Sequence, residues 1–432
     1  APAQYELVNV YTNSNLAVDQ NQITMSVMKS VAAKYGMVCL LNEKPFAGIN
    51  GSGKHNNWSM ATDRGENLLK PGKHPRDNVK FLTFFAAVVA AVDEYQDMLR
   101  ASVATPGNDN RLGGNEAPPA IVSMFVGKTM EEIIASIVSG NEYVEKTASS
   151  SGVVGSIAIT KDDTDRNRTS PFAFTGNKFE FRMVGSDMSI ADANIVLNTA
   201  VAEELGKIAD SIEKEGAENI EKILKDVFAK HGRIIFNGNN YSAEWKKEAA
   251  KRGLVNLATT VDAIPAYVND KNIELFEKHG VMTAAEMRSR YEIMVERYIK
   301  IVDIEARTML HMANREIIPA CIAFQKDVLK ELSLKKQLAD VCPELNTKAE
   351  SLLAVKLSAA TSKASAAVDK LTGDLDKASA IGDNYECAVF HKEEILTDMK
   401  LLRAQCDSLE EITDKKQWPF PTYSALLNSI KY

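Results

Sequence analysis

The sequence has 432 residues, a formal net charge of −7, and 45% hydrophobic and 25% charged residues, a composition typical of globular proteins. Lys and Arg form no dense basic stripe, and no apolar run reaches the ~18 residues of a membrane span, so we expect neither nucleic acid nor membrane as a partner. Five scattered cysteines without a Cys-x-x-Cys pair predict reduced thiols, mostly in the core of a cytoplasmic protein.

Residues 1–186 mix short strand patterns with loops, which predicts a sheet-rich domain. Helical spacing predicts helices at 21–34 and 78–103, the second with a wide apolar face. Gly and Pro residues predict loops at 42–57 and 105–115. Alternating or short apolar runs predict strands at 4–11, 37–41, 58–62, 152–160 and 178–184.

Residues 187–432 carry helical periodicity almost to the end, which predicts a second, largely helical domain with an aromatic tail. The segment 283–332 is either one long helix or two helices with a kink at Pro319. Further long helices are expected at 348–377 and 386–410, while the prolines in 418–423 exclude a helix there.

The Gly-rich segment 48–55 matches the first part of a phosphate-binding loop, G-x-x-x-x-G-K. His55 stands where that loop needs Ser or Thr, and the residues after it lack helical character, so no helix N-terminus would face a phosphate. A Gly-rich turn with an exposed His is the plainer interpretation of the spacing. A third interpretation comes from Asn50-Gly51-Ser52-Gly53 followed by His55, which resembles the N-G-[SA]-G-x-H signature of glutamine synthetases.

Four more blocks resemble the same family in the same order. Residues 1–6 resemble the end of a metal-binding strand motif, E-x-x-P-x-Q-x-E, and 110–118 resemble its R-L-x-x-x-x-E-A-P loop, here one residue shorter. Residues 165–173 resemble its phosphate-binding loop, except that Ala173 replaces an arginine. Residues 178–182 resemble its R-x-E-x-R strand, with Lys178 in place of the first arginine. Segments 43–60 and 418–423 are similar to the type III branch in particular.

The resemblance implies a role for each matching residue. The expected catalytic residues are Glu116, on a flap over the ammonium site, and Arg168, which faces the transferred phosphoryl group. The expected metal ligands are Glu6, His55 and Glu180. The expected glutamate-binding residues are Asn50, Gly51, Arg111 and Arg182, and the expected ATP-binding residues are Asn57, Ser59, Arg168 and Lys178.

The fold implied is α+β, with an antiparallel, curved, partial-barrel sheet followed by a helical C-terminal region. The implied activity is ligation of ammonia to glutamate with ATP and Mg²⁺ or Mn²⁺, through a γ-glutamyl phosphate, in a homo-oligomer of two stacked hexameric rings. Because the motifs begin in mid-strand, we expect a C-terminal catalytic portion without its N-terminal domain, inactive by itself. Two alternatives stay open: a non-catalytic oligomeric scaffold, and a γ-glutamyl ligase for another amine.

Overall fold

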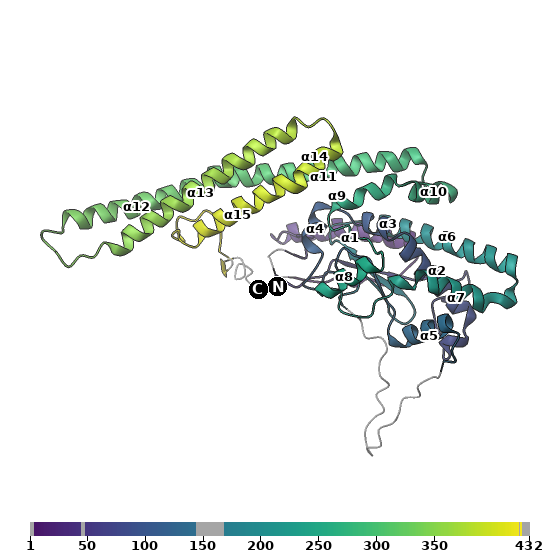
Figure 1. The fold of residues 1–432 in the computed structure, drawn as a ribbon. Helices are drawn as coiled ribbons and strands as arrows, with labels where there is room; N and C mark the ends of the chain where they lie inside the picture. The colour runs from purple at the N-terminus through teal and green to yellow at the C-terminus, as the bar shows by residue number, and fades with distance from the viewer. Residues whose placement is uncertain (1–3, 45–47, 144–167, 423, 426–432) are drawn as a thin grey trace, which may run out of the picture. The chain divides into compact units, whose positions relative to one another are not determined.

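The computed structural model describes residues 4–44, 48–143, 168–422 and 424–425. The chain forms two compact units, residues 3–291 and 292–432 (Figure 1). The first unit combines a sheet with helices, and the second is helical in its described part, so the chain is of the mixed α+β class. No helix in the described ranges is both long and apolar enough to cross a membrane. All five cysteines are free, and three of them are buried.

The sheet of the first unit has the strand order β1-β4-β3-β2. β1 and β3 both pair with β4 antiparallel, whereas β2 pairs with β3 parallel. The described sheet is therefore mixed. The expectation of an antiparallel sheet is correct for the pairs of β4 and wrong for the β2–β3 pair. A long connection that includes a helix separates these two strands, and such a crossover allows a parallel return. The strands are β1 (Lys54–Trp58), β2 (Met124–Phe125), β3 (Phe172–Phe174) and β4 (Phe179–Val184).

An aromatic cluster forms the core behind β3 and β4. Phe172 and Phe179 stack with ring centroids 4.9 Å apart, and Phe85 meets Phe174 edge-on at 5.1 Å. Phe85 lies on α2 (Val79–Glu94), a helix with eleven buried residues that begins where the Asn78 side chain accepts a hydrogen bond from the Phe81 amide. An N-cap of this kind pairs an otherwise unsatisfied amide. α2 therefore fixes the strands from behind and leaves their other side chains to form a site.

In its described residues the first unit contains nine further α-helices besides α2 and the start of α11. α6 and α7 pack against α2. These further helices are α1 (Ser14–Lys34), α3 (Gln96–Ala101), α4 (Pro106–Arg111), α5 (Lys128–Ser139), α6 (Ala191–Glu215), α7 (Ile220–His231), α8 (Ala243–Lys251), α9 (Thr260–Ala263) and α10 (Asp270–Lys278). The 3-10 turns are η1 (Pro75–Asp77), η2 (Ala217–Asn219), η3 (Gly232–Ile234) and η4 (Ile264–Val268).

The second unit is built from long helices that pack α12 on α13 and α13 on α15. Helical residues run without interruption from Ala284 to Gln337 and include a π-helical turn that ends just before Pro319. Whether the axis kinks at that proline stays a prediction. Val328, Ala354 and Leu357 form part of its core. Its elements are α11 (Ala284–Met312), η5 (Ala313–Ile317), α12 (Ile318–Gln337), α13 (Lys348–Ser379), α14 (Asn384–Phe390), η6 (His391–Ile395) and α15 (Leu396–Glu410).

Three expectations for local structure were wrong. Residues 4–11 and 37–41 form no strand, and side chains such as Val8 and Val38 are exposed. An alternating segment becomes a strand only when a neighbour pairs with it, and none of the described residues does so. Residues 105–115 contain α4 instead of loop alone, because Thr105 caps the helix and Pro106 suits its first turn.

Other expectations held in part. The helix expected at 21–34 begins earlier, at Ser14, and the strand expected at 58–62 lies at Lys54–Trp58 instead. The expected strand at 178–184 and helices at 78–103, 348–377 and 386–410 are confirmed with small shifts or breaks. The expected strand at 152–160 lies outside the described residues. The proposed boundary after residue 186 stays a prediction: regular strands end at Val184 and α6 follows.

Candidate active site

Three of the predicted side chains meet on two neighbouring strands. His55 of β1 places Nδ1 3.0 Å from Oε1 of Glu180 on β4. Arg182, two residues further along β4, donates from Nη2 (2.7 Å) and Nε (3.1 Å) to the other oxygen of Glu180. The side chain of Glu180 is 4% exposed and that of His55 is 37% exposed. The constellation is therefore buried on its carboxylate side and open on its imidazole side.

Strand geometry explains why these residues meet. In β4, Glu180 and Arg182 are two apart and share one face, while Phe179 and Phe181 face the aromatic core. Asn57 of β1 lies opposite Glu180, and the register shifts between Lys54 and Asn56, which marks a β-bulge or a similar irregularity around His55. Bulges often re-aim a side chain beside an active site.

The pKa of Glu180 shows that its partners outweigh its burial. Burial alone would raise the pKa, but the hydrogen bond from His55 and the charge and hydrogen bonds of Arg182 lower it from 4.5 to about 2. Glu180 is therefore ionised at neutral pH. Because an ionised carboxylate only accepts hydrogen bonds, His55 donates from Nδ1, and its Nε2 is the nitrogen left to bind another group.

The Gly-rich loop after residue 48 is joined to the loop that carries Glu116. The Gly51 amide donates to the Asn115 carbonyl at 3.2 Å, and Ser52 Oγ donates to the Glu116 carbonyl at 3.3 Å. Asn115 and Glu116 have φ of 52° and 71°, a left-handed backbone that is rare outside glycine and frequent at functional sites. The two loops form one wall beside the His55–Glu180 pair.

The two predicted catalytic residues are neighbours in space. Arg168 Nη1 lies 3.5 Å from Glu116 Oε1, with side-chain exposures of 81% and 36%. The residue after Arg168 is anchored: Thr169 Oγ1 accepts hydrogen bonds from the backbone and side-chain nitrogens of Asn240. The backbone beside Arg168 is therefore held in place while its guanidinium is exposed, an arrangement that suits the binding of an incoming anion.

Arg111 is placed differently from the expectation. It is buried, and its guanidinium donates to Asn108 Oδ1 (3.0 Å) and to the carbonyls of Met183 (3.1 Å) and Arg182 (2.9 Å). Its Nε forms an ion pair with Glu43. These contacts make Arg111 a cross-link between α4, β4 and residue 43, so its role as a glutamate ligand stays a prediction.

The predicted ATP-binding residues Ser59 and Lys178 lie close together. Ser59 Oγ donates to the carbonyl of Asn177, the residue before Lys178, at 2.9 Å. Asn57 is exposed on β1 and its amide reaches the His55 carbonyl at 3.4 Å. Asn50 is also exposed, whereas Gly51 is buried in the loop. The structure thus assembles Asn57, Ser59 and Lys178 along one end of the β1–β4 pair.

Glu6 is not assembled with the other predicted metal ligands. Its side chain is exposed in a segment without regular secondary structure. Among the described residues there is no group of three or more His, Cys, Asp or Glu side chains placed to hold a metal ion. The structure therefore brings His55 and Glu180 together, and the role of Glu6 stays a prediction.

Tyr241 is a residue of this region that the sequence motifs did not indicate. Its hydroxyl oxygen is buried and has no hydrogen-bond partner among the described residues. Burial raises the pKa of the phenol, as does the charge of Glu116, whereas the interaction with the Glu116 backbone and the charges of Arg111 and Arg182 lower it. The only sequence signal was its position just before Ser242, the N-cap of α8.

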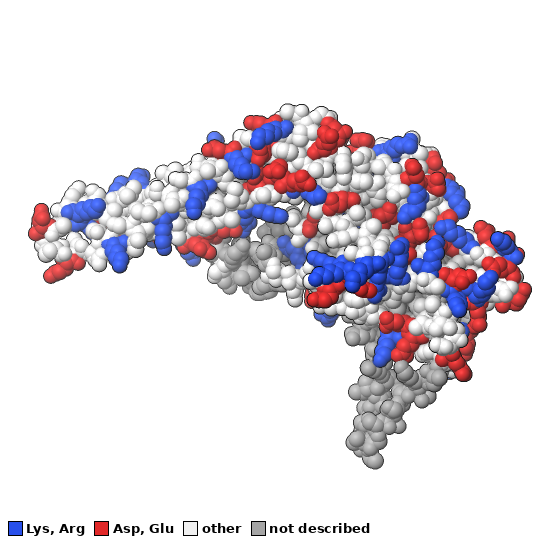
Figure 2. Space-filling model, viewed as in Figure 1, with Lys and Arg blue, Asp and Glu red and all other residues white. Residues whose placement is uncertain are grey.

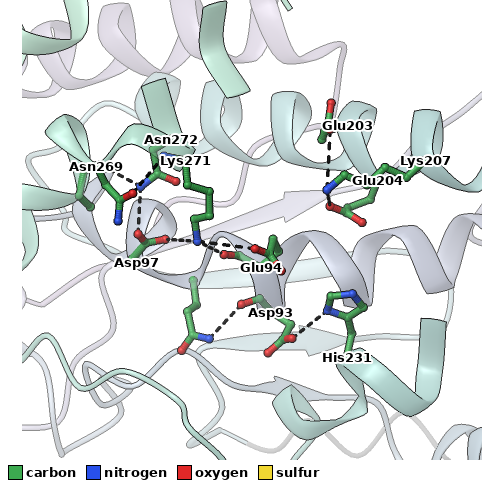
Figure 3. Close-up of polar contacts among 12 residues, drawn as sticks. Asp93, Glu94, Asp97, Glu203, Glu204, Lys207, His231, Asn269, Lys271 and Asn272 are labelled. Carbon is green, nitrogen blue, oxygen red and sulfur yellow. Dashed lines mark hydrogen bonds and ion pairs between the residues drawn. The ribbon is translucent and has the colours of Figure 1, made fainter. Parts of the chain in front are cut away.

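A second polar cluster of the first unit is closed by its own ion pairs (Figure 3). Asp93 of α2 is bound by His231 Nδ1 at 2.8 Å and by Arg233 Nε at 2.8 Å, and Lys271 of α10 lies 3.6 Å from Asp97. These pairs cross-link α2 and α3 to α7 and α10.

On the face shown in Figure 2, acidic and basic side chains are interspersed.

The chain is similar to glutamine synthetases over its whole length. Residues 1–105 match the family model described as glutamine synthetase, catalytic domain, and residues 219–336 match that of the glutamine synthetase C-terminal domain. The chain is 44% identical to the glutamine synthetase of Butyrivibrio fibrisolvens over 440 residues, which is 100% of this chain and 62% of the relative.

Two further relatives give the same result. Identity is 41% to the type-3 glutamine synthetase of Dictyostelium discoideum (99% of this chain, 59% of the relative) and 38% to the glutamine synthetase of Bacteroides fragilis (99% and 60%). The chain thus spans about three-fifths of the length of the curated relatives it matches.

Proposed function

We propose that this chain is the catalytic part of a glutamine synthetase, which uses ATP to join ammonia to the side-chain carboxylate of glutamate. The observation that carries the proposal is the His55–Glu180–Arg182 constellation, which lies beside the Gly-rich loop in a chain similar to glutamine synthetases from end to end. A carboxylate becomes a good acceptor for an amine only after its oxygen has been turned into a leaving group, and phosphorylation by ATP to a γ-glutamyl phosphate does so.

The donor set of the site suits a divalent cation. His55 Nε2 is a ring nitrogen on the exposed side of the pair, and Glu180 is an ionised carboxylate next to it. Imidazole and carboxylate both bind Mn²⁺ or Mg²⁺, and Mg²⁺ is commonly held by one or two carboxylates together with substrate phosphates and water. Such an ion supplies charge neutralisation for phosphoryl transfer when bound. In the same proposal Glu6 is a further ligand.

Arg168 and Glu116 supply the groups that act on the reacting atoms. Phosphoryl transfer depends on positioning and on neutralising charge at the transferred group, and an exposed arginine can do this. Arg168 is such an arginine, held near Glu116 by a weak ion pair of 3.5 Å that an incoming phosphate can replace. Glu116 then attracts ammonium, helps to remove its proton, and shields the acyl phosphate from water.

The remaining predicted ligands complete the proposal. Asn57, Ser59 and Lys178, at one end of the β1–β4 pair, contact ATP, and Asn50, Gly51 and Arg182 contact glutamate. For Arg111 to contact glutamate as well, its bonds to Asn108 and the strand carbonyls must be exchanged. The type III branch, the curved partial-barrel sheet and the assembly into two stacked hexameric rings are implied by the resemblance and belong to the same proposal.

Release of ADP by the complete natural protein tests the function. We expect release that requires both glutamate and ammonium, together with equimolar glutamine identified by chromatography. Methylamine and a diamine, offered in place of ammonium, test the alternative of another γ-glutamyl ligase. ADP release that is independent of glutamate or of any amine would refute the proposal.

Metal binding separates a catalytic site from a scaffold. Calorimetric titration with Mn²⁺ should show binding that is weakened in His55→Ala, with Glu221→Gln, an exposed residue paired with Arg76, as the matched control. Equal Mn²⁺ affinity in the wild type and His55→Ala would remove His55 from the metal site. The absence of Mn²⁺ binding from the complete protein would favour the scaffold.

A further inference from the structure

Glu43 is a buried acidic residue with no role in the site described above. It lies before the Gly-rich loop, is 8% exposed, and pairs through its carboxylate with Nε of Arg111 on α4. Arg111 in turn donates to the carbonyls of Arg182 and Met183 on β4. The carboxylate of Glu43 is therefore connected through one guanidinium to the strand that carries Glu180.

The backbone of Glu43 contacts Gln4 and the Gly-rich loop. Its carbonyl oxygen accepts a hydrogen bond from Gln4 Nε2 at 3.1 Å. A Cβ atom added to Gly51 would lie 2.4 Å from that carbonyl oxygen and 2.5 Å from Gln4 Nε2, so the loop can approach this closely only with glycine. Glu43 thus packs directly against the Gly-rich loop.

The neighbouring residue, Lys44, joins the two loops. Its ammonium group donates to the carbonyl of Ile49 at 3.0 Å and to the carbonyl of Asn115. The Asn115 carbonyl also accepts the Gly51 amide. The dipeptide Glu43–Lys44 therefore contacts α4, the Gly-rich loop and the loop of Glu116.

We propose that Glu43 is a positioning residue for the ligase site: its carboxylate fixes Arg111, and through the contacts of residues 43–44 it keeps the Gly-rich loop and the Glu116 loop in register. The activity part of this inference rests on the proposed function, whereas the structural part does not. Glu43 touches no reacting atom, so its effect on turnover passes through the position of Glu116 and the left-handed backbone at 115–116.

The charge of Glu43 matters because Arg111 is buried. Removing one partner of a buried ion pair leaves the other charge without compensation in a low-dielectric site. The Arg111 guanidinium would then turn toward water or another acceptor. Gly53 would move with it, because the two residues are closely packed: a Cβ at Gly53 would lie 2.7 Å from the guanidinium. Glu43→Gln keeps the shape and removes the charge, whereas Glu43→Asp keeps the charge on a shorter side chain.

Hydrogen–deuterium exchange on the complete protein tests the structural part. In Glu43→Gln we expect the exchange of peptides that cover 48–53 and 113–117 to accelerate about tenfold or more, a local opening of roughly 1.4 kcal/mol. Peptides of α2 should be unchanged, as should all peptides in the control Glu221→Gln. Unchanged loop exchange in Glu43→Gln, or equal acceleration in α2, would overturn the inference.

Steady-state kinetics test the functional part. A misplacement of about 1 Å can cost ~10²-fold in rate, so we expect kcat of Glu43→Gln to fall between about 10- and 100-fold with KM for ATP nearly unchanged. Glu43→Asp keeps the charge and should recover most of the lost kcat. If Glu43 served stability alone, kcat of the folded Glu43→Gln protein would not fall and would need no such recovery. Loosened loops with unchanged kcat would overturn the positioning role. A wild type without ligase activity would instead refute the proposed function and leave the exchange result standing.

Discussion

Replacing Glu180 by Gln is the sharpest perturbation of the candidate site. Its carboxylate is 4% exposed and is bound by His55 and Arg182. Despite burial, which acts in the opposite direction, these partners lower the pKa of Glu180 from 4.5 to about 2. At about 1.4 kcal/mol for each pKa unit, the ionised form stabilises the fold by about 3 kcal/mol at neutral pH. Glu180→Gln should lose a stability of this order.

The pH dependence gives the sign of this effect. A carboxyl group whose pKa is lower in the folded state stabilises above its unfolded pKa, here 4.5, and loses that contribution as the pH falls through about 2. The difference in unfolding free energy between wild type and Glu180→Gln should therefore be largest at pH 7 and about two-fifths as large at pH 3. Urea denaturation followed by tryptophan fluorescence measures it, because Trp58 is buried on β1. A difference that stays constant between pH 7 and pH 3 would refute the reasoning.

Three further predictions concern residues of the candidate site and of the loops around it. Arg168→Ala should lower kcat by ~10³-fold in the complete protein, because an arginine on the transferred phosphoryl group is worth at least that much; unchanged turnover at saturating substrates would remove it from the mechanism. Gly53→Ala should lower the melting temperature, since its Cβ would meet the Val184 carbonyl at 2.2 Å, and overpacking costs about 1–3 kcal/mol; Gly107→Ala, with nothing within 4 Å, is the control and should not destabilise. Tyr241→Phe should change the unfolding free energy by less than about 1 kcal/mol, because its buried hydroxyl oxygen has no hydrogen-bond partner of normal geometry among the described residues; a larger loss by thermal denaturation would contradict this reasoning.

Local patterns were enough to predict part of the site. The alternation in residues 178–182 predicted that Glu180 and Arg182 share a face with the phenylalanines behind them, and β4 confirms it. A side chain alternates simply because the strand has a period of two residues. The absence of helical character after His55 argued against a phosphate-binding loop, and Lys54–Trp58 is indeed a strand.

Other features depend on partners that the sequence does not name. The motif at 110–118 indicated that Arg111 lies near the site, but its neighbours Glu43 and Met183 come from segments about 70 residues away on either side. Residues 4–11 alternate as a strand does, yet they lack a pairing partner among the described residues. Tyr241 was missed because nothing in its local sequence distinguishes it from other residues before a helix.

By itself, the sequence determined the properties that depend on neighbours along the chain: the helical second half, the buried helix α2, the two faces of β4, and the order of the motif blocks. The tertiary structure decided which side chains are paired and buried. It joined His55 to Glu180 across two strands, tied Arg111 to Glu43, and placed Arg168 beside Glu116. The reason is physical: periodicity and capping are local, whereas ion pairing and desolvation depend on residues that meet only when the chain folds.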